Sequence, residues 1–280
     1  MKPKFIKILS LSLVLNIAIT GCKDKKNNGA NPEIAVANSY LLSIAKDICG
    51  SQTEVISLVP PGMCPGHFDI SPRQVEKLSQ CKTLLLFDFQ SQLGDALARI
   101  SQHGLKIHDI ECPEGLCLPQ TYLTIARSVA DALTQDNPDK RAEYEQGLEM
   151  MEKRLDNLDN EIHTKIEQLG LRNTDVISSV HQAEFAGWLG LDVVATFSGN
   201  DTETPAGINQ CLMQANDRSV KLVIANKQEG IELATALAER LNAKMIVFSN
   251  FPAGDDNTAD RPLFDSLLLE NVSQLSGTGE

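Results

Sequence analysis

Residues 137–170 read NPDKRAEYEQGLEMMEKRLDNLDNEIHTKIEQLG. Asn137 is a good helix N-cap, Pro138 suits the first helical position, and Gly170 can end a helix. A single apolar stripe recurs at steps of three and four residues and consists of Tyr144, Leu148, Met151, Leu155, Leu158, Ile162, Ile166 and Leu169. At 1.5 Å per residue such a helix is roughly 48 Å long. The stretch therefore predicts one long, rigid helix over 136–170.

Short apolar segments alternate with amphipathic ones on both sides of this helix. Before it, we expect strands at 34–37, 54–58, 84–87 and 106–110, with helices at 40–48, 72–79, 93–100 and 122–133. After it, we expect strands at 176–179, 193–196, 222–225 and 245–248. This alternation is typical of parallel sheets. We predict an α/β fold with two parallel-sheet lobes, over 33–135 and 171–280, and a ligand cleft between them.

The apolar stripe of the long helix is compatible with two placements. The helix could pack along both lobes, or it could form a surface hairpin arm. We expect it to join the lobes. One continuous helix resists bending more than two flexible crossing strands would, so only modest opening is expected when a ligand leaves.

The first 32 residues have the pattern of an export signal followed by a tether. Residues 1–21 carry three lysines and then an apolar run that is too short to span a membrane, which predicts a secretory signal. The run ends in residues 19–22, ITGC, which resemble a bacterial lipobox and imply a lipid anchor on Cys22. Residues 22–32 contain no apolar side chain large enough to form a core after the cysteine, and they predict a flexible tether. The alternative is an uncleaved apolar tail with an incidental cysteine.

The composition limits the partners and the compartment. The formal net charge of −12 argues against binding to nucleic acid or to an anionic membrane face, and it is compatible with cation capture. The export signal predicts an extracytoplasmic protein, anchored to the bilayer through Cys22, and we expect a monomer. Disulfides are permitted in that compartment, but the cysteines that follow Cys22 allow many pairings, so their connectivity stays open.

Metal-ligating side chains follow several of the expected strands. The segments in question are 60–69 (PPGMCPGHFD), 111–119 (ECPEGLCLP), 181–184 (HQAE) and Asn250 with Asp255 and Asp256. Ligands bind at the carboxyl ends of strands in open α/β sheets, and histidine, cysteine and carboxylate are the usual donors to transition metals. A lone histidine is more often a hydrogen-bonded loop residue, but the shared placement predicts a common metal site.

The order of these segments resembles the cluster A-I substrate-binding lipoproteins of zinc and manganese ABC importers. The matching stretches are 54–62 (EVISLVPPG), 71–73 (SPR), 137–138 (NP), 179–191 (SVHQAEFAGWLGL) and 220–224 (VKLVI). They extend over nearly the whole mature chain. The resemblance implies a binding protein without catalytic activity, which captures a divalent metal ion as cargo and delivers it to an ABC transporter permease. Zinc is the first expectation, and manganese or another transition metal the second.

The resemblance also implies a ligand set. The family uses a histidine from each of the first three loops, or two histidines and a carboxylate, plus an acidic residue from the last loop. His181 matches the third position, whereas His67 comes one residue late in the first loop and Glu114 replaces the second histidine. The implied metal ligands are Cys64, His67, Glu114 and His181. Additional metal ligands could come from Cys112, Cys117 and Asn250, the last of which stands where the family has an aspartate.

Three alternatives remain open at this point. A thiolate ligand would favour a softer ion than manganese, but a Cys64–Cys112 or Cys112–Cys117 disulfide would remove sulfur from the site. The same scaffold could carry a metal chelate or another small molecule. A secreted metalloenzyme could use Glu114 or Glu184 as its general base, although no compact catalytic motif is present. Trp188 is expected to pack under the third loop rather than to stack on a ligand.

Overall fold

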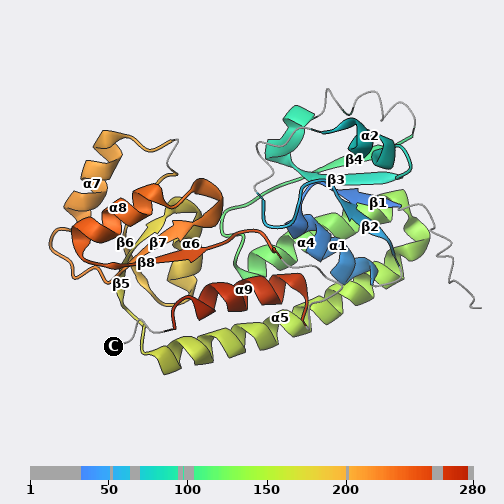
Figure 1. The fold of residues 1–280 in the computed structure, drawn as a ribbon. Coiled ribbons are helices and arrows are strands. Elements are labelled where there is room, and N and C mark those ends of the chain that lie inside the picture. The colour runs from blue at the N-terminus through green and yellow to red at the C-terminus, as the bar shows by residue number, and fades with distance from the viewer. Residues whose placement is uncertain are drawn as a thin grey trace, which may run out of the picture.

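The computed structural model describes residues 33–50, 53–63, 70–93, 97, 104–199, 202–253 and 261–276. Within these residues the strands form two parallel sheets, one in each lobe (Figure 1). The first sheet has the order β2-β1-β3-β4 and contains β1 (Ile34–Val36), β2 (Val55–Ser57), β3 (Thr83–Phe87) and β4 (Lys106–Ile110). The second has the order β6-β5-β7-β8 and contains β5 (Asp175–Ser179), β6 (Asp192–Phe197), β7 (Leu222–Asn226) and β8 (Lys244–Phe248). The predicted pair of α/β lobes is confirmed.

Helices connect the strands and cover both sheets. The α-helices are α1 (Ser39–Cys49), α2 (Pro72–Leu78), α4 (Pro119–Asp136), α5 (Arg141–Leu169), α6 (Val180–Trp188), α7 (Pro205–Ala215), α8 (Glu232–Leu241) and α9 (Leu263–Ser273). Short 3₁₀ helices are η2 (Asp88–Leu93), η3 (Pro138–Lys140) and η4 (Lys227–Glu229). The helix expected at 93–100 lies mostly outside the described residues. Within the described part of the chain, every helix is too short or too polar to cross a membrane.

The long helix α5 runs beneath both lobes (Figure 1). Pro138 begins a 3₁₀ turn that leads into α5 at Arg141, and Gly170 ends the helix in the left-handed conformation, with φ 66°. Asn137 makes no side-chain capping hydrogen bond. Most of the predicted stripe is buried, from Tyr144 to Ile166. The helix therefore joins the lobes, and the hairpin-arm alternative is wrong.

One hydrophobic core is shared by the two lobes. It includes apolar residues of α1, α4, α5 and α9 together with residues of α6, β5 and β8. Smaller cores lie on the outer faces, one beside α2 and the other beside α7 and α8. Although α9 follows the second sheet in sequence, its Phe264 stacks on Tyr122 of α4 with ring centroids 3.9 Å apart. A boundary at residue 171 thus separates the sheets but not this helix.

Four helices also meet at a buried charged cluster. Arg154 of α5 donates to both carboxylate oxygens of Asp47 in α1, at 2.8 and 2.7 Å. Tyr122 of α4 donates to the same carboxylate at 2.8 Å. Asp265 of α9 lies 3.2 Å from Nε of Arg154, but its Oδ1 has no well-aligned hydrogen-bond donor. Burial consequently raises the pKa of Asp265 to about 6, despite the nearby guanidinium.

The order of the strands defines a crevice in each lobe. In the second sheet, β5 lies next to β6 on one side and β7 on the other, so the connections that leave β5 and β7 diverge. Such a switch point leaves a crevice at the carboxyl ends of the two central strands. The residues that follow β5 and β7 are therefore placed to meet a ligand.

Candidate metal site

A histidine and a glutamate face each other at the switch point of the second lobe. His181 lies in the first turn of α6, directly after β5, and Glu229 lies in η4, directly after β7. His181 Nδ1 is 2.7 Å from Oε1 of Glu229. The hydroxyl of Ser179 donates to the other carboxylate oxygen at 2.5 Å. Both oxygens of Glu229 are thus engaged, which fixes the carboxylate beside the imidazole.

This pairing leaves one imidazole nitrogen free for a metal. Because Nδ1 faces a carboxylate, the neutral ring places its proton there and keeps the lone pair on Nε2. The hydrogen bond to Glu229 raises the pKa of His181 against the opposing effect of burial. Burial alone would raise the pKa of Glu229, but the hydrogen bonds from His181 and Ser179 outweigh it and lower that pKa. The His181 side chain is 61% exposed, so an ion can reach it.

Glu114 approaches His181 from the first lobe. It lies in the loop after β4 and is exposed. The next residue, Gly115, has φ 73°, and a Cβ at that position would lie 3.3 Å from Cβ of Glu184 in α6. The charge of Glu114 contributes to the raised pKa of His181. The loop that carries Glu114 thus packs against α6, and the charge of Glu114 acts on His181 across the two lobes.

The other two predicted principal ligands, Cys64 and His67, lie outside the described residues. The same holds for Asp255, Asp256 and the predicted lipidation site Cys22. Among the residues that are described, no group of three or more histidine, cysteine or acidic side chains could hold a metal ion. His181 and Glu114 therefore do not by themselves complete a metal site within the described part of the chain.

Asn250, predicted as an additional ligand, is engaged elsewhere. It is buried, and its Oδ1 accepts from Nε2 of Gln182 at 2.8 Å and from the thiol of Cys117 at 3.4 Å. Its backbone N–H donates to Gln228, which in turn donates to the carbonyl of Gly62 at 3.1 Å. This network of neutral groups joins the first lobe to the second. The amide oxygen that would bind a metal is used to hold the lobes together.

Cys112 and Cys117 are both free thiols, so the Cys112–Cys117 disulfide is not formed. Burial raises the pKa of Cys112 to about 12, with a smaller contribution from the charge of Asp88. Burial also raises the pKa of Cys117, which is only 1% exposed. A thiolate is the form that binds a metal, and both environments disfavour it. Neither cysteine joins His181 and Glu114 in a cluster of potential ligands.

Glu229 is the site residue that sequence reasoning missed. It follows the strand predicted over 222–225, and a single glutamate after a strand does not by itself indicate a site. Glu229 follows β7, and the strand next to β7 in the sheet is β5, which is followed directly by His181. The feature that identifies Glu229 is the strand order, in which β5 and β7 are adjacent. Residues that follow adjacent central strands meet at one crevice.

Comparisons with known proteins identify the family of the chain. The family described as zinc-uptake complex component A, periplasmic, matches residues 34–277. The metal ABC transporter substrate-binding lipoprotein SsaB of Streptococcus sanguinis is 22% identical over 202 residues, which are 64% of this chain and 65% of that protein. The manganese ABC transporter substrate-binding lipoprotein PsaA of Streptococcus anginosus is 21% identical over 196 residues, 61% of this chain and 63% of that protein. The chain thus matches slightly less than two thirds of the length of these relatives.

Solved structures share the fold. The Mn-bound periplasmic metal binding protein from Candidatus Liberibacter asiaticus superposes with a TM-score of 0.72 at 14% identity, and the match covers 88% of this chain and 99% of that one. A crystal structure of ZnuA gives a TM-score of 0.69 at 18% identity and covers 88% and 98%. At these identities the likeness establishes the two-lobed architecture and not the bound ion.

Proposed function

Because the chain belongs to the family of periplasmic zinc-uptake component A proteins, we propose that it is the substrate-binding lipoprotein of a metal ABC importer. In this proposal it captures a divalent metal ion outside the cytoplasm, tethered to the bilayer through Cys22, and passes the ion to a permease. The names of the relatives support the same class of function. The proposal assigns the protein no catalytic step.

The observation that carries the proposal is the His181–Glu229 pair with Glu114 close by. A histidine whose Nδ1 is held by a carboxylate presents Nε2 to a metal in a fixed orientation. Glu114 comes from the other lobe, so an ion held by both residues would contact both lobes. His67 and Cys64 would supply the remaining donors from the segment 64–69. Imidazole, carboxylate and thiolate are all accepted by zinc, and we therefore propose zinc before manganese.

Elemental analysis of the purified mature protein tests this proposal. We expect about one zinc per chain after dialysis against zinc, and we expect the His67→Ala/His181→Ala variant to lose it. His163→Gln, on α5, removes another imidazole as a control and should retain the metal. Equal metal content in the wild type and the double variant would reject the proposed site. Calorimetric titration with zinc and manganese salts then ranks the two ions.

A metal chelate is the second candidate cargo, because exposed apolar side chains follow several strands. Met63 follows β2, Phe89 follows β3, Val180 follows β5 and Ile231 follows β7, and each is at least 40% exposed. A bare ion makes no use of such side chains, whereas the organic part of a chelate could contact them. Calorimetry with zinc alone and with zinc bound to a small organic chelator distinguishes the two. Tighter binding of the chelate would favour this second cargo.

A further inference from the structure

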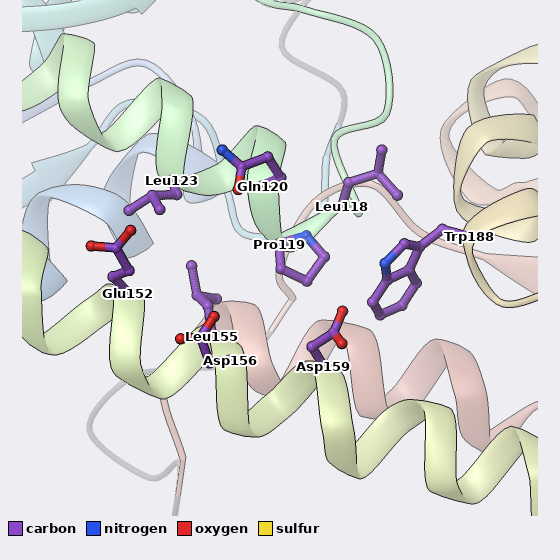
Figure 2. Close-up of a pocket in the computed structure, with 9 residues that line it drawn as sticks. All are labelled: Leu118, Pro119, Gln120, Leu123, Glu152, Leu155, Asp156, Asp159 and Trp188. Atoms are coloured by element: carbon purple, nitrogen blue, oxygen red, sulfur yellow. The ribbon is translucent and has the colours of Figure 1, made fainter.

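A cavity of about 190 Å³ lies where α4, α5 and α6 meet (Figure 2). Its apolar wall includes Leu118 and Pro119 at the start of α4 and Leu155 of α5. Trp188 closes it from the last turn of α6. The cavity is thus built by the first lobe, the joining helix and the second lobe together. We refer to it as the α4–α5–α6 pocket.

Carboxylates of α5 also line this pocket. Asp156 and Asp159 are one helical turn apart, and Glu152 is one turn before Asp156 (Figure 2). Glu152 is 3.2 Å from Arg127, but within the described residues neither Asp156 nor Asp159 has a lysine or arginine partner. Asp159 has only His163, at 3.7 Å. The pocket therefore combines an apolar wall with unneutralised negative charge, which favours a cation that has an apolar stem.

Trp188 adds an aromatic surface and a hydrogen-bond donor. Its ring is supported by Phe185, at 5.7 Å between centroids, and by His163 of α5, at 4.6 Å. It therefore packs between α6 and α5, and it also borders the pocket. In Figure 2 the indole nitrogen is on the side of the ring that faces Leu118 and Pro119. No acceptor for this N–H is found among the described residues.

We propose that the α4–α5–α6 pocket binds an arginine side chain presented by a segment of a protein partner. A guanidinium is planar, can take carboxylates bidentately and stacks on aromatic rings, whereas an ammonium is a more strongly hydrated point charge. Its aliphatic stem fits the wall of Leu118, Pro119 and Leu155. The indole N–H and the amide of Gln120 can bind a peptide backbone, which a free cation lacks. These features favour a protein segment over a small organic cation.

The position of the pocket places such a contact between the lobes. Pro119 follows the loop that carries Glu114, and Trp188 is on the helix that begins beside His181. An arginine bound between them would contact both lobes at once. The proposal does not depend on the metal site, because none of the pocket residues is among the proposed ligands.

Fluorescence of the protein tests this proposal directly, since Trp188 is the only tryptophan of the chain. The full mature protein is titrated with the peptide acetyl-Gly-Arg-Gly-amide and with the same peptide containing citrulline, which has nearly the same shape but no charge. We expect a saturable change in Trp188 emission with the arginine peptide only. The Asp156→Asn/Asp159→Asn variant should bind the arginine peptide at least roughly fivefold more weakly, because it loses two partly exposed ion pairs.

The matched control is Glu145→Gln/Glu149→Gln, which removes the same charge from α5 outside the pocket. It should bind like the wild type. An equal response to the citrulline peptide, or an equal loss in the control variant, would overturn the proposal. Binding of methylguanidine as tight as that of the peptide would also overturn it, because the occupant would then be a small cation. Metal content is measured in parallel, so failure here is separable from failure of the metal site.

Discussion

At the scale of single residues, Glu229 tests whether His181 is a metal ligand. The carboxylate fixes the ring through Nδ1, and loss of such a partner typically weakens metal binding about 10- to 100-fold. We expect Glu229→Gln to weaken zinc binding by that factor in calorimetric titrations, without removing a ligand. Glu239→Gln, on α8, removes the same charge and should have no effect. Unchanged affinity in Glu229→Gln would contradict the proposed role of the pair.

Asp265 predicts an unusual dependence of stability on pH. Its folded-state pKa of about 6 is above the ordinary 3.8, so the carboxyl favours the folded state at low pH. That contribution is lost as the pH rises from about 4 through about 6, and it amounts to about 3 kcal/mol at most. Asp265→Asn lacks the ionisation and should therefore gain stability relative to the wild type over this range.

Chemical denaturation at pH 4, 5, 6 and 7 measures this difference. The free energies of unfolding of the wild type and Asp265→Asn should diverge as the pH rises, with the variant the more stable at pH 7. Asp131→Asn, an exposed change on α4, provides the control and should follow the wild type at every pH. Parallel curves for Asp265→Asn and the wild type would show that Arg154 compensates fully for the burial of the carboxylate.

At the scale of elements, Gly147 sets how closely α5 packs against α1. A Cβ at this position would lie 2.6 Å from the carbonyl oxygen of Ile48, which is backbone and cannot rotate away. Gly147→Ala should therefore destabilise the protein by about 1–3 kcal/mol, although alanine has the higher helix propensity. Gly187→Ala in α6 meets nothing within 4 Å and should stabilise by about 0.5–1 kcal/mol. Thermal unfolding of the two variants compares them, and equal shifts would contradict this account of the packing.

The regular elements could be predicted because their patterns are local. The stripe from Tyr144 to Ile166 and the stop at Gly170 define α5 within one stretch of chain. The packing of α9 could not be predicted, because the contact of Phe264 with Tyr122 joins residues that are far apart in sequence. His181 could be found from its place after a strand, whereas Glu229 required the strand order. Asn250 was predicted as a ligand from its position alone, which gives no information about its hydrogen bonds to Gln182 and Cys117.

At the scale of the whole molecule, the shared core predicts that the lobes move little. Separating them would expose apolar surface along α5 and break the bonds that join Cys117 to Asn250 and Gly62 to Gln228. We expect the radius of gyration from small-angle X-ray scattering to be the same, within error, with zinc bound and after chelation. The Asn250→Ala variant should show a larger difference between the two states. A clear expansion of the wild type on chelation would contradict this expectation.

The return of α9 to the first lobe has a consequence for the order of events during synthesis. The ribosome makes α1 and α4 early. Phe264, which stacks on Tyr122 of α4, is added only after the whole second sheet has been translated. The half of the protein that is translated first is thus the half that is finished last. A nascent chain that stops before residue 263 must hold an incomplete apolar surface, which makes it a natural client for chaperones.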